Sequence, residues 1–288
     1  MKNIILRWAF ILFIFCFVGG LVYAGTPEVE NNLLLEAALL IFGIQILVFL
    51  PSFLAQTEHF YDLTGGVTYL TTMSYMAYRH QQIFGEWDLR SLVLTALIGI
   101  WAIRLSSFLF TRVKRVGKDG RFDALKTSFT RFLLTWMLQG LWVFMCTYPA
   151  LIALASASNE ETIFLSIGAA IWAIGWIYEV IADRQKSTFN KDPKNEGKFI
   201  NIGLWKQSRH PNYVGEVVLW TGITIMAIPV YAGGQWLAFI TPVFVYWLLN
   251  KVSGVNLLER RADAKWGSDP AYQKYKSETP IFFPNLFK

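Results

Sequence analysis

Runs of about 20 apolar residues limit how this chain can fold more than any other feature of its sequence. A helix of roughly 20 residues spans a hydrocarbon core of about 30 Å, so each run is a candidate transmembrane helix. Hydrophobic residues fill 54% of the 288 positions and charged residues 16%, which excludes a disordered chain and is too apolar for ordinary soluble domains. We therefore expect an all-α, polytopic membrane protein whose single integral membrane domain covers residues 1–288. Its eight predicted spans lie at about 5–24, 32–54, 63–79, 91–111, 131–156, 161–182, 212–231 and 236–256.

The first apolar run leaves the number of spans open between eight and seven. Lys2 and Arg7 near its start and the small pair Ala24-Gly25 at its end are typical of a cleaved signal peptide. Its apolar stretch of about 17 residues is longer than the usual core of such a peptide, which favours a retained helix.

Lysine and arginine are concentrated in alternate connections between the predicted spans. Cytoplasmic loops of membrane proteins are rich in these residues, so the basic connections and both termini are predicted to be cytoplasmic. The connection 79–90, with Arg79 and Arg90, departs from this alternation. The basic loops also account for the net charge of +6, so we expect no nucleic-acid partner. The basic segments are 112–131, 182–211 and the tail after Asn250, whereas 25–31, 157–160 and 232–235 contain no Lys or Arg.

Carboxylates inside the predicted spans are candidates for function, because a charged side chain in a bilayer is costly. Glu36 lies near the outer end of its span and is interpreted as structural. Asp183 is expected to end a helix, where the partial negative charge of the last carbonyls disfavours an acid. Glu179 lies one turn earlier on the same face. Either lysines of the following loop balance these two acids, or the acids bind the hydroxyl groups of a nucleotide ribose.

The densest polar cluster is the stretch GLWKQSRHPNYVGE, residues 203–216. Pro211 suits the first turn of a helix and Ser208 can cap it. The helix start then presents free backbone N–H groups beside Arg209 and His210, a combination suited to a phosphate. Asn212 and Glu216 share a helix face that can hydrogen-bond a planar polar ring. The alternative, a basic membrane-surface anchor, leaves Asn212 and Glu216 unexplained.

The stretch QTEHFYD, residues 56–62, is the candidate source of a proton donor. Glu58 and Asp62 can also provide the acidic partner expected for Arg104, which lies nine residues before the inner end of its span near Val113. A solvated turn in which Asp62 caps a helix starting at Leu63 explains the same residues.

The tail is expected to form an amphipathic helix, a break at Gly267 to Pro270 and a short aromatic-basic helix. Binding to the membrane surface explains this pattern. The tail, residues 257–288, can equally cover a bound nucleotide through Arg260, Tyr272 or Tyr275.

These motifs together resemble a known group of membrane proteins. GLWKQSRHPNYVGE, EVIAD, TEHFYDLTGG and DPAYQKYKSETPIFFPNLF are similar to segments of the bacterial membrane proteins grouped with the steroid 5-alpha reductases, and more distantly to sterol reductases and isoprenylcysteine carboxyl methyltransferases. The resemblance implies an all-helical enzyme of the bacterial inner membrane that binds NADPH from the cytoplasm and reduces a carbon–carbon double bond conjugated to a carbonyl. It places the nicotinamide contacts on Asn212 and Glu216, and a cofactor-holding acid on Asp183.

The chain also departs from the steroid enzymes. Glu179 occupies the position of their asparagine, and Trp101 and Arg104 lie where their tyrosine helix is expected. A lipid enone or an unsaturated acyl chain is therefore as reasonable a substrate as a steroid.

The leading hypothesis is an NADPH-dependent ene-reductase of a lipophilic substrate taken from the bilayer. A methyltransferase that uses S-adenosylmethionine is the rival enzyme, because an Arg-His-Pro-x-Tyr-x-Gly string also occurs in the isoprenylcysteine type. A non-catalytic lipid-binding protein is the third hypothesis. We expect no metal, and the oligomeric state is left open. The expected catalytic residues are Glu58, Tyr61, Asp62 and Arg104, and the expected cofactor-binding residues are Glu179, Asp183, Lys198, Ser208, Arg209, His210, Asn212, Tyr213, Glu216, Glu259, Arg260, Tyr272 and Tyr275.

Overall fold

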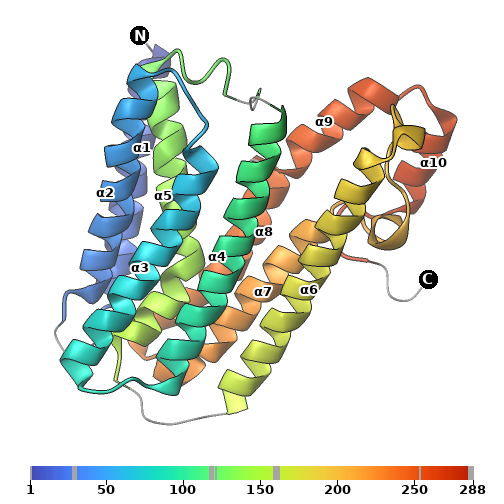
Figure 1. Cartoon of the computed structure of the whole chain (residues 1–288). Helices are drawn as coiled ribbons and strands as arrows, with labels where there is room; N and C mark the ends of the chain where they lie inside the picture. Colours follow the sequence, from blue (N-terminus) through green and yellow to red (C-terminus); the bar gives the residue numbers. More distant parts are fainter. Residues whose placement is uncertain are drawn as a thin grey trace. The chain divides into compact units, whose positions relative to one another are not determined.

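The structure, a computed structural model, describes residues 2–27, 31–116, 120, 122–157, 163–252 and 254–284. Within these ranges the regular structure is helical (Figure 1), as the sequence predicts. The chain divides into two compact units. The first contains Met1–Leu165 and Met226–Phe239, and the second contains Ser166–Ile225 and Ile240–Lys288.

The first unit is a helical bundle built around helix α5. Helices α1 to α4 all pack against α5, and 83% of its most apolar stretch is buried. Large side chains of α5 fill the centre, among them the fully buried Phe132, Trp136 and Tyr148. The helices are α1 (Lys2–Gly25), α2 (Leu33–Leu54), α3 (Tyr61–Phe84), α4 (Leu89–Val116) and α5 (Phe129–Ala155), followed by short 3-10 turns at Ile228–Val230 and Gly233–Phe239.

The second unit contains two long helices and the helical tail. The predicted break in the tail is confirmed, since α9 ends just before Gly267 and α10 begins at Pro270 with the Asp269 side chain accepting from the Ala271 backbone N–H at 2.8 Å. The elements are α6 (Ile163–Lys191), 3-10 turns at Pro193–Asn195 and Gly203–Lys206, α7 (Pro211–Met226), α8 (Ile240–Trp247), a π-helical turn (Leu248–Val252), α9 (Val255–Trp266) and α10 (Pro270–Glu278).

Six of the eight predicted spans meet the length and hydropathy of a membrane-crossing helix in the described part of the chain. Helix α7 falls short because it has 16 residues, fewer than the roughly 20 that a bilayer requires. Helix α3 falls short because threonines, glutamines and His80 lower its hydropathy. The chain is therefore a multi-pass membrane protein with about six candidate spans, which are Asn3–Gly25, Leu33–Leu54, Leu89–Thr111, Phe129–Ala155, Ile163–Lys191 and Gly233–Trp266.

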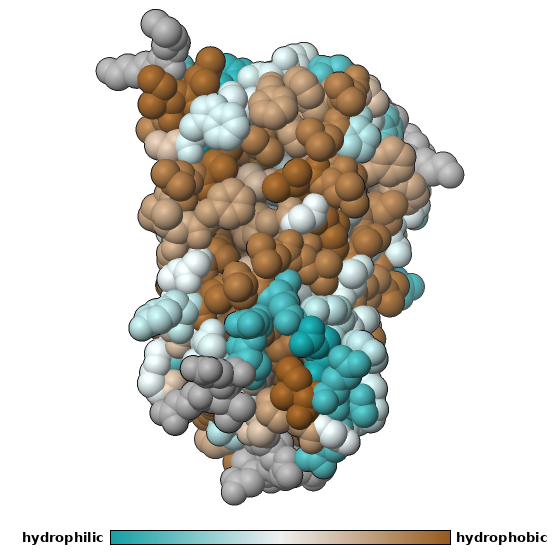
Figure 2. All heavy atoms as spheres, turned by 90° about the vertical axis from the view of Figure 1, so that its left-hand side faces the viewer, coloured by the Kyte–Doolittle hydropathy of each residue, from teal (hydrophilic) through white to brown (hydrophobic). Residues whose placement is uncertain are grey.

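The surface of α1 and α2 agrees with a lipid environment. Large apolar side chains such as Ile5, Leu12, Leu39, Leu47 and Leu54 are exposed on these helices. Figure 2 shows the face on the left of Figure 1, where apolar side chains form a broad band and hydrophilic residues gather in the lower part. Such an extensive exposed apolar surface is unusual for a soluble monomer.

One predicted boundary is wrong. Helix α6 continues to Lys191 instead of ending at 182, because Phe189 packs with Ile200 and Trp205 in a small core. The helix ends before Pro193, which disfavours helical backbone in the residue that precedes it. The expected last span, 236–256, lies within the candidate span Gly233–Trp266, and it consists of a 3-10 turn, α8 and a π-helical turn up to Val252.

Candidate functional site

Helices α6 and α7 pack closely through glycines. A Cβ atom at Gly215 would lie 2.6 Å from the carbonyl oxygen of Gly175 and 2.7 Å from the backbone nitrogen of Glu179, and a Cβ at Gly175 would lie 2.5 Å from the backbone nitrogen of Leu219. These are backbone atoms, so a side chain at either glycine would force the helices apart. The close crossing places the backbone of Glu179 against the turn of α7 that carries Glu216.

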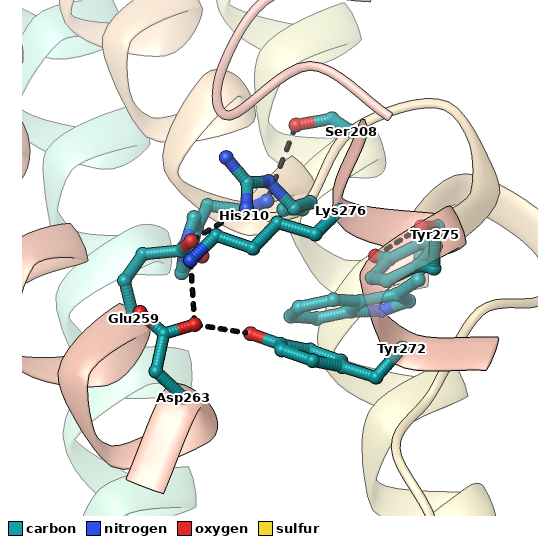
Figure 3. Close-up of polar contacts among 9 residues, drawn as sticks. Ser208, His210, Glu259, Asp263, Tyr272, Tyr275 and Lys276 are labelled. Atoms are coloured by element: carbon teal, nitrogen blue, oxygen red, sulfur yellow. Dashed lines mark hydrogen bonds and ion pairs between the residues drawn. The ribbon is translucent and has the colours of Figure 1, made fainter. Parts of the chain in front are cut away.

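The start of α7 joins the tail through a carboxylate. Helix α7 begins at Pro211, as predicted, and the His210 backbone N–H donates to Ser208 Oγ at 3.2 Å. Arg209 Nη1 donates to Glu259 Oε2 at 2.6 Å, and His210 Nε2 lies 2.9 Å from Glu259 Oε1. Glu259 of α9 therefore holds both basic side chains, as Figure 3 shows for His210.

The surroundings of His210 favour the neutral form of its imidazole. Burial lowers the pKa of His210 below 6.5, and the nearby charges of Lys186 and Arg209 also lower it, whereas the hydrogen bond to Glu259 and the charge of Glu259 raise it. A neutral imidazole has one donor and one acceptor nitrogen, so Nε2 carries the hydrogen that Glu259 accepts. Nδ1 is then a buried acceptor, and it has no hydrogen-bond partner among the described residues; the same holds for the Arg209 Nε donor.

Aromatic side chains of α10 pack against the segment 199–205. The ring of Phe199 stacks on Tyr275 at 5.4 Å and meets the edge of Tyr272 at 5.2 Å. Tyr275 donates to the carbonyl oxygen of Trp205 at 2.6 Å, and the Lys186 ammonium lies 4.5 Å from the centre of the Trp205 ring. Burial, with the charges of Glu259 and Asp263, raises the pKa of Tyr272 to about 12, so this phenol stays neutral.

Sequence reasoning missed Asp263 of α9, which makes polar contacts with two side chains of α10. Its Oδ1 accepts from Lys276 at 2.5 Å and from the Tyr272 hydroxyl at 3.3 Å (Figure 3). Glu259 and Asp263 are four residues apart on α9 and therefore share a face. That spacing was visible in the sequence and was the available signal.

The remaining cofactor candidates differ in exposure. Asn212 is half-buried, and Tyr213 stacks on His210 with ring centres 5.7 Å apart. The side chains of Lys198 and Arg260 are exposed. Glu179 and Asp183 share a face of α6 as expected, but Asp183 lies well inside the helix. The argument from a helix C-terminus at Asp183 is therefore wrong, because α6 extends beyond it.

Acidic side chains predominate among the buried charged groups of the second unit. Within the described residues, three carboxylates have less than a tenth of their surface exposed, at Glu179, Asp183 and Glu216, against one guanidinium, at Arg209. Burying a carboxylate requires compensation by a partner or a bound cation. The buried charge among the described residues of this unit is therefore mainly negative.

The four expected catalytic residues lie in the first unit. Glu58 is buried and accepts from Lys126 Nζ at 2.7 Å, and the hydroxyl of Tyr61 donates to the carbonyl oxygen of Thr135 at 3.0 Å. Arg104 lies over the Phe108 ring at 5.4 Å. Helix α3 begins at Tyr61, so Asp62 belongs to its first turn and does not cap a helix at Leu63.

Two further ion pairs of the first unit were not predicted. Glu36 accepts from Arg79 at 2.7 Å and from the Tyr75 hydroxyl at 2.8 Å, which supports its structural interpretation and explains why Arg79 departs from the loop charge pattern. His80 Nε2 lies 2.7 Å from Asp88 Oδ2, and its Nδ1 lies 2.9 Å from the carbonyl oxygen of Leu154. The first pair joins α2 to α3 and the second joins α3 to the residue that precedes α4, and the sequence reveals neither pairing.

Comparison with known proteins gives the chain a family. Residues 48–279 match the family described as "Protein of unknown function (DUF1295)". The chain belongs to the DUF1295 family. The DUF1295 match includes the 56–62 stretch, the α6–α7 crossing and most of the tail.

This DUF1295 protein is also similar to a named relative. It is 23% identical over 238 residues to the "Probable O-methyltransferase ustE" of Ustilaginoidea virens. The match covers 82% of this chain and 64% of the relative, so the chain spans less than two thirds of that protein.

Proposed function

We propose that this DUF1295 protein is a membrane-embedded enzyme that transfers a methyl group from S-adenosylmethionine to an oxygen of an apolar acceptor. The observation that carries the proposal is the excess of buried carboxylates, Glu179, Asp183 and Glu216, over the one buried guanidinium in the described part of the second unit. S-adenosylmethionine has a cationic sulfur and an ammonium group, whereas NADPH carries several phosphate charges. The distant relative named as a probable O-methyltransferase supports the same chemistry.

The unpartnered atoms at the start of α7 fit the amino-acid end of this cofactor. Arg209 Nε is a buried donor and His210 Nδ1 a buried acceptor, neither with a hydrogen-bond partner among the described residues. A carboxylate accepts from the first and an ammonium donates to the second. Leaving both atoms unsatisfied costs about 1–3 kcal/mol each, so a ligand that satisfies them gains correspondingly.

The chain's own residues position and shield the site. Glu259 fixes the tautomer of His210, because its carboxylate accepts the Nε2 hydrogen. Tyr272 and Phe199 supply aromatic surface beside this pair. When bound, the cofactor supplies a methyl group on a positively charged sulfur, and the protein supplies orientation and electrostatics.

NADPH-dependent reduction of a conjugated double bond is the second candidate. It is favoured by the Arg209 Nε donor, which also suits a phosphate, and by the positions of Asn212 and Glu216 four residues apart on α7.

Direct titration separates the two candidates. We expect the full chain in lipid nanodiscs, without an acceptor, to bind S-adenosylmethionine at least tenfold more tightly than NADPH by calorimetry, a difference of about 1.4 kcal/mol. Glu216→Gln should weaken that binding. The control variant Glu278→Gln, whose side chain is 62% exposed, should not. Tighter binding of NADPH would refute the methyltransferase proposal and favour the reductase.

A further inference from the structure

Helix α6 carries a pair of tryptophans on the same stripe as its two buried acids. At 100° per residue, positions 172, 176, 179 and 183 fall within one narrow face of a helix. The rings of Trp172 and Trp176 stack with centres 5.6 Å apart and planes 12° apart. The stripe therefore presents two indoles followed by two carboxylates, the first of which, Glu179, lies about 10 Å along the axis from Trp172 and about 4.5 Å from Trp176.

Both indole N–H groups are buried donors without an acceptor among the described residues. The residue Trp172 is 4% exposed. A Cβ at Gly222 would lie 2.6 Å from the backbone nitrogen of Trp172, so the close packing against α7 fixes the helix segment that carries this ring. Buried donors in native proteins are almost always paired, and each exception calls for a ligand, a water or a functional role. Two such donors on one helix face, next to each other, indicate a site for an acceptor atom.

We propose that Trp172 and Trp176 form the subsite that binds the acceptor oxygen of the apolar substrate. This inference rests on the proposed methyl transfer, because a substrate oxygen must be held near the site marked by Glu179 and Asp183. The indole N–H groups donate hydrogen bonds to a hydroxyl, carbonyl or carboxylate oxygen, while the ring faces contact the apolar body. Tryptophan suits this role because it joins a large apolar surface to one donor. The two residues bind and position the substrate, and they take no proton.

The test uses nuclear magnetic resonance of the indole N–H groups in the full chain labelled with ¹⁵N-tryptophan, in nanodiscs. Single Trp→Phe variants assign the signals among the 12 tryptophans. The probes are myristate and tetradecan-1-ol, which carry an oxygen acceptor, and tetradecane, which is their apolar control. We expect the two oxygen-bearing probes, but not tetradecane, to shift the signals of Trp172 and Trp176.

Trp136 is the matched control within the protein. It is fully buried in α5 and its Nε1 also has no hydrogen-bond partner among the described residues, but it belongs to the first unit. Unchanged Trp172 and Trp176 signals with both oxygen-bearing probes, equal shifts with tetradecane, or an equal shift at Trp136 would each overturn the proposal.

A paired binding measurement keeps the inference separate from the proposed function. The double variant Trp172→Phe/Trp176→Phe keeps two aromatic rings and should weaken myristate binding roughly fivefold or more, because it removes two hydrogen bonds. Its affinity for S-adenosylhomocysteine should stay within about twofold of that of the unsubstituted protein. A change of about 1.4 kcal/mol would alter the affinity tenfold. If S-adenosylhomocysteine does not bind the unchanged protein, the proposed function fails. If it binds and the indole signals do not respond, the tryptophan subsite fails.

Discussion

Replacing Gly215 by alanine tests whether the close α6–α7 crossing shapes the cofactor site. The new Cβ would lie 2.6 Å from the carbonyl oxygen of Gly175, and ordinary contact begins at 3.4 Å, so the helices must separate locally by 0.8 Å (3.4 − 2.6). Overpacking of this kind costs about 1–3 kcal/mol, against a gain of about 1 kcal/mol from the better helix propensity of alanine. The net loss of stability is therefore roughly 0–2 kcal/mol.

Binding is expected to weaken as well, because Glu179 and Glu216 lie on the two helices that separate. We expect Gly215→Ala to weaken S-adenosylmethionine binding about tenfold, or about 1.4 kcal/mol, as measured by calorimetry with thermal unfolding in parallel. The control is Gly43→Ala in α2, where an added Cβ meets nothing within 4 Å. That variant should be neutral or slightly stabilising. If the two variants have equal affinities and melting temperatures, the reasoning from the glycine crossing is refuted.

Three further variants test the ion pairs and the histidine. Glu259→Gln removes the charge that Arg209 and His210 share, so we expect about 1–3 kcal/mol lower stability in thermal unfolding; an unchanged melting temperature would show that the pairs contribute nothing. The folded pKa of His210 lies below 6.5, so the unfolded chain binds more protons as the pH falls below about 6.5 and the melting temperature should drop. His210→Gln should reduce that pH dependence, and an identical profile in the variant would contradict the assignment. Lys126→Met should destabilise the protein by about 1–3 kcal/mol because the buried carboxylate of Glu58 loses its cation. The double variant with Glu58→Gln should recover part of the loss, and additive losses would argue against the pairing.

Local signals in the sequence predicted local structure well. Pro211 marks the start of α7, and the Gly267 to Pro270 segment marks the break before α10, because each residue acts on its own backbone. The apolar runs predicted eight spans, and six of these meet the length and hydropathy of a membrane-crossing helix in the described residues. The end of α6 was missed because Phe189 is buried by tertiary contacts that local sequence does not contain.

The pairings of the candidate site could not be predicted for a related reason. Glu259 is 50 residues from Arg209 and 49 from His210 in the chain, and Lys126 is 68 residues from Glu58. Hydropathy and spacing identify each residue as costly to bury, but they do not say which partner the fold brings to it. For the same reason, the sequence identifies Glu179, Asp183 and Glu216 as candidate buried acids, but it does not show that they outnumber the buried basic side chains among the described residues of the second unit.

The π-helical turn at Leu248–Val252 belongs to the connection that leads to the tail, and α9 begins after Gly254. A π turn holds one residue more than an α turn, as if a single residue had been inserted into an α-helix. Deleting one residue here would shorten the connection that ends at Gly254, and it would move Glu259 of α9 away from Arg209 and His210. The pairing of Glu259 with Arg209 and His210 thus depends on the length of this connection. Insertions and deletions here are expected to be far rarer among related sequences than substitutions.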